Sequence, residues 1–191
     1  MQNGWKGAVK LRVNADAMTL YAVTDRTWVK DTTLMDQVKE ALEGGITFLQ
    51  LREKHLSKEE FIKEAREMKE LSKEYKVPFV INDNIEVALA VDADGVHIGQ
   101  DDMSVEEARK LLGEDKIIGV SAHNVEEAIK AQKGGADYLG VGAVCATSTK
   151  KDANVVSKEE IKKICHTVEI PVVAIGGIKK ENIKNTRRNG C

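Results

Sequence analysis

Short apolar runs rich in Val, Ile and Leu alternate along the chain with longer stretches rich in Lys, Glu and Ala. This alternation is typical of a buried parallel sheet whose strands are covered by helices. The pattern predicts seven strands, near Leu20 to Thr24, Ile46 to Leu51, Phe79 to Asn82, Gly95 to Ile98, Ile117 to Val120, Tyr138 to Val141 and Val172 to Ile175.

The stretches between these runs have the spacing of amphipathic helices. After Ser57, the apolar residues Phe61, Ala65, Met68 and Leu71 recur every three or four positions and predict one stripe that packs on the sheet. Four stretches also begin with a capping residue and an acidic first turn, which is a helix start signal, at Ser57, Ser104, Asn124 and Ser157.

Seven strand and helix units of roughly 24 residues each are close to the repeat of a (β/α)₈ TIM barrel. The main alternative is a doubly wound open sheet, which usually carries a glycine-rich turn after its first strand. Here Thr24-Asp25-Arg26 follows the first strand and no G-x-G-x-x-G occurs. We therefore expect a single barrel domain over residues 1–191, with residues 1–17 as an N-terminal extension.

The charge balance changes this picture little. The 29 basic and 31 acidic residues give a net charge of -2 without long runs of either sign, so we expect no nucleic-acid or membrane partner and only small-molecule ligands. The spacing of the three cysteines speaks against a disulfide framework and a zinc site. With no apolar secretory segment at the start, we expect a cytoplasmic protein; the oligomeric state stays open.

Polar side chains gather at the predicted carboxyl ends of the strands, where barrel enzymes carry their chemistry. Gln50, Arg52 and Lys54 suit an anionic ligand with a polar ring, although a solvated loop would also explain them. Asp83, with Asp101 or Asp102 from the next strand, could hold Mg²⁺. The alternative is that these acids cap the helices that follow.

Later strand ends carry further candidates for phosphate binding. Ser121 could donate a hydrogen bond or merely begin a turn, and Gly176-Gly177 would let backbone N–H groups approach an anion. The loop from Thr147 to Lys151 is dense in hydroxyls and lysines, which suits phosphate. His97 is more typical of a packed barrel histidine than of a catalytic one.

Six of these motifs together resemble the thiamine phosphate synthase family. In order they are Leu20-Tyr21-Ala22-Val23-Thr24-Asp25, Gln50-Leu51-Arg52-Glu53-Lys54, Ile81-Asn82-Asp83, His97-Ile98-Gly99-Gln100-Asp101-Asp102, Val120-Ser121 and Thr147-Ser148-Thr149-Lys150-Lys151-Asp152-Ala153. The family joins 4-amino-2-methyl-5-(diphosphooxymethyl)pyrimidine to a thiazole phosphate, giving thiamine phosphate and pyrophosphate.

The resemblance implies a role for each matching residue and Mg²⁺ as cofactor. The pyrimidine diphosphate would be held by Gln50, Leu51, Arg52, Glu53, Lys54, Asn82, Ser121 and Lys150. The thiazole phosphate would be held by Thr147, Ser148, Thr149 and Gly177. Asp83 and Asp102 would hold Mg²⁺. No catalytic residue is implied beyond these binding groups, because the substrate's own amino group can stabilise the cation left when pyrophosphate departs.

Two departures from the family pattern leave alternatives open. Ala143-Val144-Cys145-Ala146 replaces a proline-containing segment, and the family continues beyond Cys191 with an eighth strand and a final helix. We therefore expect a barrel that lacks its eighth βα unit in this chain and an incomplete thiazole phosphate site. The alternatives are a thiazole tautomerase-like paralogue, which could use His123 for proton transfer, and an inactive ligand-binding barrel fragment.

Overall fold

The computed structural model describes residues 12–146 and 155–183. Seven strands and six α-helices alternate along these residues, after a short 3₁₀ turn, η1 (Asp16–Met18), and with a second, η2 (Arg26–Trp28), following the first strand. The strands are β1 (Tyr21–Val23), β2 (Phe48–Leu51), β3 (Phe79–Asn82), β4 (Gly95–Ile98), β5 (Ile117–Ala122), β6 (Tyr138–Val141) and β7 (Val172–Ala174). The helices are α1 (Leu34–Glu43), α2 (Lys58–Glu74), α3 (Ile85–Ala90), α4 (Val105–Leu112), α5 (Val125–Gly134) and α6 (Lys158–Thr167).

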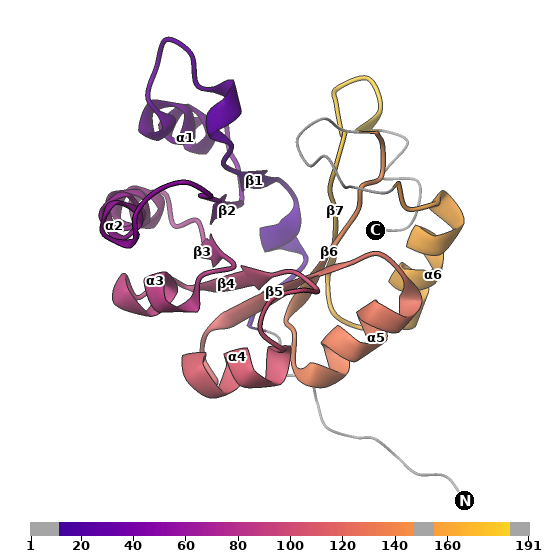
Figure 1. Cartoon of the computed structure of the whole chain (residues 1–191). Coiled ribbons are helices and arrows are strands. Elements are labelled where there is room, and N and C mark those ends of the chain that lie inside the picture. The colour runs from indigo at the N-terminus through magenta and orange to yellow at the C-terminus, as the bar shows by residue number, and fades with distance from the viewer. Residues whose placement is uncertain (1–11, 147–154, 184–191) are drawn as a thin grey trace, which may run out of the picture.

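The seven strands form one parallel sheet in which each strand pairs with the next in the chain. The sheet curls into a nearly closed barrel, and the helices surround it (Figure 1). β1 and β7 occupy the two ends of the sheet and are only half-buried; within the described part of the chain no further strand pairs with them. The predicted barrel is confirmed, and each of the seven predicted strands is present.

Side chains along each strand alternate between two cores, as strand geometry requires. Leu49 and Leu51 of β2 point outward into a large core shared with the helices. Phe48 points inward, into a smaller core inside the barrel that also contains Val80 and Tyr138. This alternation decides which residues can reach the barrel interior.

The helix starts form as the sequence predicts. The side chains of Ser57, Ser104, Asn124 and Ser157 each accept a hydrogen bond from a backbone N–H in the first turn of the following helix. Ser57 and Ser104 form complete capping boxes with the glutamates three residues later. The predicted stripe on α2 is buried at Phe61, Ala65 and Met68.

Residues 12–18 close the barrel at the amino ends of the strands. Arg12 donates from Nη1 to Oδ1 of Asp137 at 2.8 Å, and Arg109 donates from Nη2 to its Oδ2 at 2.7 Å. Val13 and Met18 are buried against the inner core. We call this group, Arg12, Val13, Met18, Arg109 and Asp137, the barrel floor.

Two further expectations can be compared with the structure. Among the described helices none is both long and apolar enough to cross a membrane. Cys145 is a free thiol, whereas Cys165 is disulfide-bonded, contrary to the expectation from the cysteine spacing.

Candidate functional site

The carboxyl ends of β2, β3 and β4 bring a lysine and two acids together. The Lys54 Nζ donates to Oδ2 of Asp83 at 2.6 Å. Asp102 turns back toward its own strand, where its Oδ2 accepts from the Gly99 backbone N–H at 2.7 Å. Burial and the adjacent Asp83 carboxyl raise the pKa of Asp102, and this outweighs the lowering effects of the Gly99 N–H and of Lys54.

Neither acid serves as a helix cap. Asn84 caps α3 and Ser104 caps α4, so the alternative that these acids serve as helix caps is wrong. Asp83 has a φ of 60°, in the left-handed region that non-glycine residues rarely adopt. Its N–H donates to the His97 carbonyl of the neighbouring strand at 2.8 Å, which holds this turn in place.

This acidic pair fits a divalent cation. Two carboxylates in contact repel each other, and a bound cation would relieve that repulsion. Mg²⁺ commonly takes one or two protein carboxylates and fills its other positions with water and substrate phosphate oxygens. In residues 12–146 and 155–183 no three acidic, histidine or cysteine side chains converge, so Asp83 and Asp102 would be the two acidic ligands.

A chain of hydrogen bonds crosses the barrel interior from Gln50 to Ser121. The Gln50 Nε2 donates to the Tyr21 hydroxyl at 2.7 Å, and that oxygen lies 2.7 Å from the Tyr138 hydroxyl. The Tyr138 hydroxyl lies 3.0 Å from His97 Nδ1, and His97 Nε2 lies 3.0 Å from Ser121 Oγ. We call these five residues the interior hydrogen-bond chain.

Two glycines make room for the rings of this chain. A Cβ at Gly119 would lie 2.0 Å from Cζ of Tyr138, and one at Gly140 would lie 3.0 Å from Cε1 of His97. Burial raises the pKa of both Tyr21 and Tyr138 well above the usual value, so both stay protonated phenols. Neither tyrosine is predicted as a site residue from the sequence, although glycines within strands are a signal of close approach.

The remaining residues predicted for the pyrimidine diphosphate divide between the two faces of the barrel wall. Leu51 is fully buried in the outer core, and the Glu53 side chain, 3% exposed, is ion-paired with Arg26 at 2.9 Å. Both therefore face away from the barrel interior. Arg52 lies near Asp25. Burial raises the pKa of Asp25, but hydrogen bonds from Thr27 and the charge of Arg52 together bring this pKa below its ordinary value. Asn82 ends β3, half-buried.

The second half of the predicted site is described only in part. Gly177 follows β7 with a φ of 66°, and a Cβ there would lie 2.6 Å from the Ala146 carbonyl oxygen, so a side chain would not fit. Thr147, Ser148, Thr149 and Lys150 lie outside the described residues. Gly177 is thus the one predicted thiazole phosphate residue whose geometry can be given.

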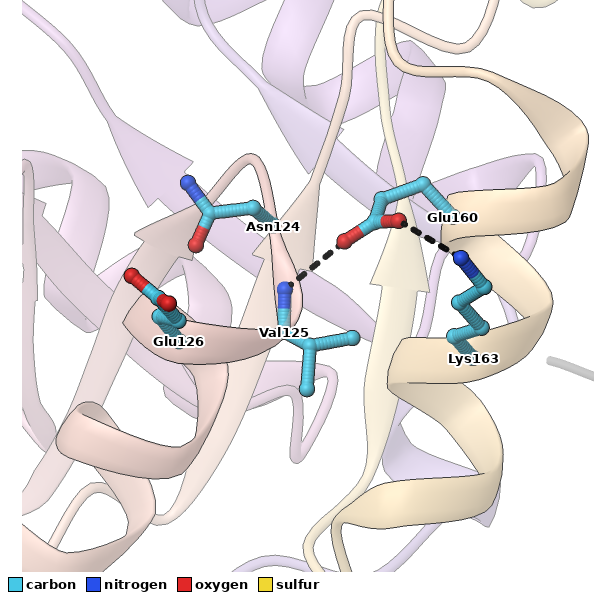
Figure 2. Close-up of a pocket in the computed structure, with 5 residues that line it drawn as sticks. All are labelled: Asn124, Val125, Glu126, Glu160 and Lys163. Carbon is cyan, nitrogen blue, oxygen red and sulfur yellow. Dashed lines mark hydrogen bonds and ion pairs between the residues drawn. The ribbon is translucent and has the colours of Figure 1, made fainter.

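A separate hollow of about 550 Å³ lies between the starts of α5 and α6 (Figure 2). The Glu160 carboxylate there accepts from the Val125 N–H at 3.0 Å and pairs with Lys163 at 3.7 Å. Of the predicted site residues that the structure describes, none lines this hollow. Nearby, Nδ1 of His123 pairs with the Glu127 carboxylate at 2.9 Å. His123 is the residue that the tautomerase alternative would use for proton transfer, and in this structure its Nδ1 already contacts Glu127.

The chain resembles known proteins over most of its length. The family model for thiamine monophosphate synthase matches residues 20–191. A thiamine-phosphate synthase from Clostridium acetobutylicum is 54% identical over 171 residues, which cover 90% of this chain and 81% of that protein. One from Ruminiclostridium cellulolyticum is 53% identical over 175 residues, covering 90% and 83%.

A solved structure supports the same assignment. The thiamine phosphate pyrophosphorylase from Pyrococcus furiosus superposes with a TM-score of 0.84 at 42% identity, covering 92% of this chain and 83% of that one. The matched residues include the whole of the acidic pair and the interior hydrogen-bond chain, since the family model begins at residue 20. The chain therefore belongs to the thiamine monophosphate synthase family.

Proposed function

We propose that this chain transfers the pyrimidine of 4-amino-2-methyl-5-(diphosphooxymethyl)pyrimidine to a thiazole phosphate, releasing pyrophosphate and forming thiamine phosphate. The observation that carries the proposal is the meeting of Lys54, Asp83 and Asp102 at one end of the barrel, in a chain of this family. A diphosphate needs cationic groups and metal ligands in one place, and this cluster supplies both.

The protein's part in this reaction is to bind, orient and stabilise charge. The C–O bond to pyrophosphate breaks first, and negative charge grows on the leaving oxygens. Lys54 and Arg52, at the end of β2, would stabilise that charge as it develops. Gln50 and Ser121 would hold the pyrimidine ring, so that the thiazole nitrogen attacks a carbon already in position.

Magnesium enters this proposal through Asp83 and Asp102. When bound, Mg²⁺ would supply positive charge to the departing pyrophosphate. The Lys54 ammonium, which pairs with Asp83 at 2.6 Å, would then be free to turn toward the diphosphate. Because the raised pKa of Asp102 comes from burial and from Asp83, a cation between the two acids would favour both carboxylates in their charged form.

The test is to incubate the chain with both substrates and Mg²⁺ and to follow thiamine phosphate. Product that disappears with a chelator and returns with added Mg²⁺ supports the proposal. Asp83→Asn and Asp102→Asn should each lower kcat/KM by on the order of 100-fold or more, the usual loss for one preorganised electrostatic group.

Asp101→Asn is the matched control, because Asp101 is an exposed acid next to Asp102. It should leave kcat/KM and the Mg²⁺ requirement close to those of the unmodified chain. Full activity in Asp83→Asn and Asp102→Asn would refute the metal assignment. A folded chain that makes no product under any of these conditions would instead favour the inactive ligand-binding barrel.

A further inference from the structure

The loop that follows β1 holds the segment that follows β2. The Thr24 hydroxyl accepts a hydrogen bond from the Arg52 backbone N–H at 2.8 Å and donates one to the Arg52 carbonyl at 3.4 Å. Next along both segments, Nε of Arg26 pairs with Oε1 of Glu53 at 2.9 Å. We call Thr24, Arg26 and Glu53 the loop clamp. It fixes the backbone of Arg52 and the side chain of its neighbour.

The loop clamp is itself held in place by neighbouring contacts. Thr24 is 7% exposed, so water does not compete for its hydroxyl. Between Thr24 and Arg26, Oδ1 of Asp25 accepts from the backbone N–H of Thr27 at 2.9 Å and from its hydroxyl at 2.7 Å. Arg26 also pairs through Nη2 with Glu64 of α2. The clamp therefore joins the end of β1, the segment after β2 and the helix that covers them.

Strand alternation separates the clamp's acid from the groups proposed to bind the diphosphate. Leu51 faces the outer core, and the Glu53 side chain, on the same face, is only 3% exposed. Arg52 and Lys54 alternate with these two residues. Lys54 reaches Asp83 at the carboxyl end of the barrel, at 2.6 Å. Glu53 therefore lies in the chain between two proposed ligand groups while its carboxylate points away from them.

We propose that Thr24, Arg26 and Glu53 are positioning residues, which fix Arg52 and Lys54 for the diphosphate without touching it. The inference rests on the proposed function. Ordering a loop and long side chains during binding weakens affinity, so a segment that is held beforehand binds its ligand more tightly. Small displacements of positioned groups are also costly.

A second threonine makes the same kind of contact at the other end of the same two strands. The Thr47 hydroxyl accepts from the Leu20 backbone N–H at 2.8 Å and donates to the Leu20 carbonyl at 3.3 Å. Leu20 directly precedes β1, and Thr47 directly precedes β2, so this contact lies at the amino ends of the strands. Thr47→Val is therefore a matched control for Thr24→Val.

The test of ligand positioning is the binding of inorganic pyrophosphate to the full chain with Mg²⁺, measured by calorimetry. Thr24→Val keeps the shape of the side chain and should weaken pyrophosphate binding by about tenfold or more. Thr24→Ser restores the hydroxyl and should restore the affinity, and Thr47→Val should keep it. A folded Thr24→Val chain that binds pyrophosphate as tightly as Thr47→Val would overturn the proposal.

Glu53→Gln separates positioning from direct contact. If the Glu53 carboxylate touched the diphosphate, removing its negative charge would strengthen pyrophosphate binding, because two anions repel each other. Positioning predicts the opposite, since the neutral amide no longer forms an ion pair with Arg26. Weaker binding in Glu53→Gln supports the proposal, whereas equal or tighter binding would overturn the part assigned to Glu53.

Amide hydrogen exchange tests the clamp without any ligand. In the ¹⁵N-labelled full chain, the Glu53 and Lys54 amides should exchange faster in Thr24→Val than in Thr47→Val, because the segment can open more easily. Equal exchange would overturn the clamp even if the enzyme is active. An unmodified chain that binds no pyrophosphate would instead overturn the proposed function, and exchange would still decide whether Thr24 holds the segment. The two failures are therefore distinguishable.

Discussion

Replacing Asp137 by Ala removes the carboxylate that holds the barrel floor together. Asp137 accepts from Arg12 and Arg109, and its Oδ2 also accepts from the Ile118 backbone N–H at 2.8 Å. Its side chain is only 2% exposed, so water cannot take its place. In the variant the guanidinium groups of Arg12 and Arg109 lose the carboxylate between them, and the Ile118 N–H loses its acceptor.

The expected loss of unfolding free energy is about 3–5 kcal/mol. Breaking a buried ion pair by removing one partner costs about that much, and an unpaired buried N–H alone costs about 1–3 kcal/mol. The two costs share one carboxylate and do not simply add. Arg12 keeps Glu114, and Arg109 keeps the Gly113 and Gly135 carbonyls, which limits the total.

Asp94 provides the matched comparison. It stands directly before β4 as Asp137 stands before β6, and its Oδ2 accepts from the Phe79 N–H at 2.8 Å. Asp94 is exposed, so Asp94→Ala should cost only about 1 kcal/mol, since water can replace the lost hydrogen bond. Urea denaturation should then separate the two midpoints by about 1.5 M, for a slope of about 2 kcal/mol/M.

Equal losses in Asp137→Ala and Asp94→Ala would refute this reasoning, because the shared backbone hydrogen bond would then account for both. A second check is Arg12→Ala in the Asp137→Ala background. It should cost much less there than in the unmodified chain, because its main partner is already gone.

Three further predictions follow from single features of the fold. Gly119→Ala places a Cβ 2.0 Å from Cζ of Tyr138 and should destabilise the chain by about 1–3 kcal/mol or more, with an altered near-ultraviolet dichroism of that tyrosine. Ser104→Ala removes a capping box and should cost about 1 kcal/mol in urea denaturation. Burial raises the pKa of Glu64, and the neighbouring Glu53 raises it further. The ion pair with Arg26 lowers it, but the raising effects are larger. The folded state therefore holds this proton more tightly, so stability from this group rises as pH falls through the raised pKa toward the ordinary glutamate value; Glu64→Gln should lack that rise in unfolding free energy.

The strands and helices could be predicted from the sequence because their periodicity is a local property. Apolar runs such as Phe79 to Asn82 and stripes such as the one on α2 depend only on neighbours in the chain. The acidic pair was also predictable, because Asp83 and Asp102 follow adjacent parallel strands whose carboxyl ends share one edge. Choosing Asp102 over Asp101 needed the family resemblance, and in the structure Asp102 is the acid that contacts Asp83.

The interior hydrogen-bond chain depends on the curling of the sheet, which no local pattern in the sequence predicts. Tyr21 on β1 and Tyr138 on β6 are not neighbours in the sheet, and their hydroxyls meet only because the sheet curls. In the sequence each looks like one more large residue of a strand. The family resemblance placed Leu51 and Glu53 among the ligand contacts, whereas strand alternation directs both side chains to the outer face of the barrel.

The barrel floor also constrains how this protein can be made. Arg12 and Asp137 are 125 positions apart in the sequence, so a chain growing from its amino terminus has synthesised the first partner long before the second. At ordinary translation rates of about 5–20 residues per second, that interval lasts about 6–25 s. Throughout it, Val13 and Met18 lack Tyr138, the large ring of the inner core against which they are buried. Closing so distant a contact is slow, so the apolar side chains of Val13 and Met18 stay without this partner until most of the barrel has been made.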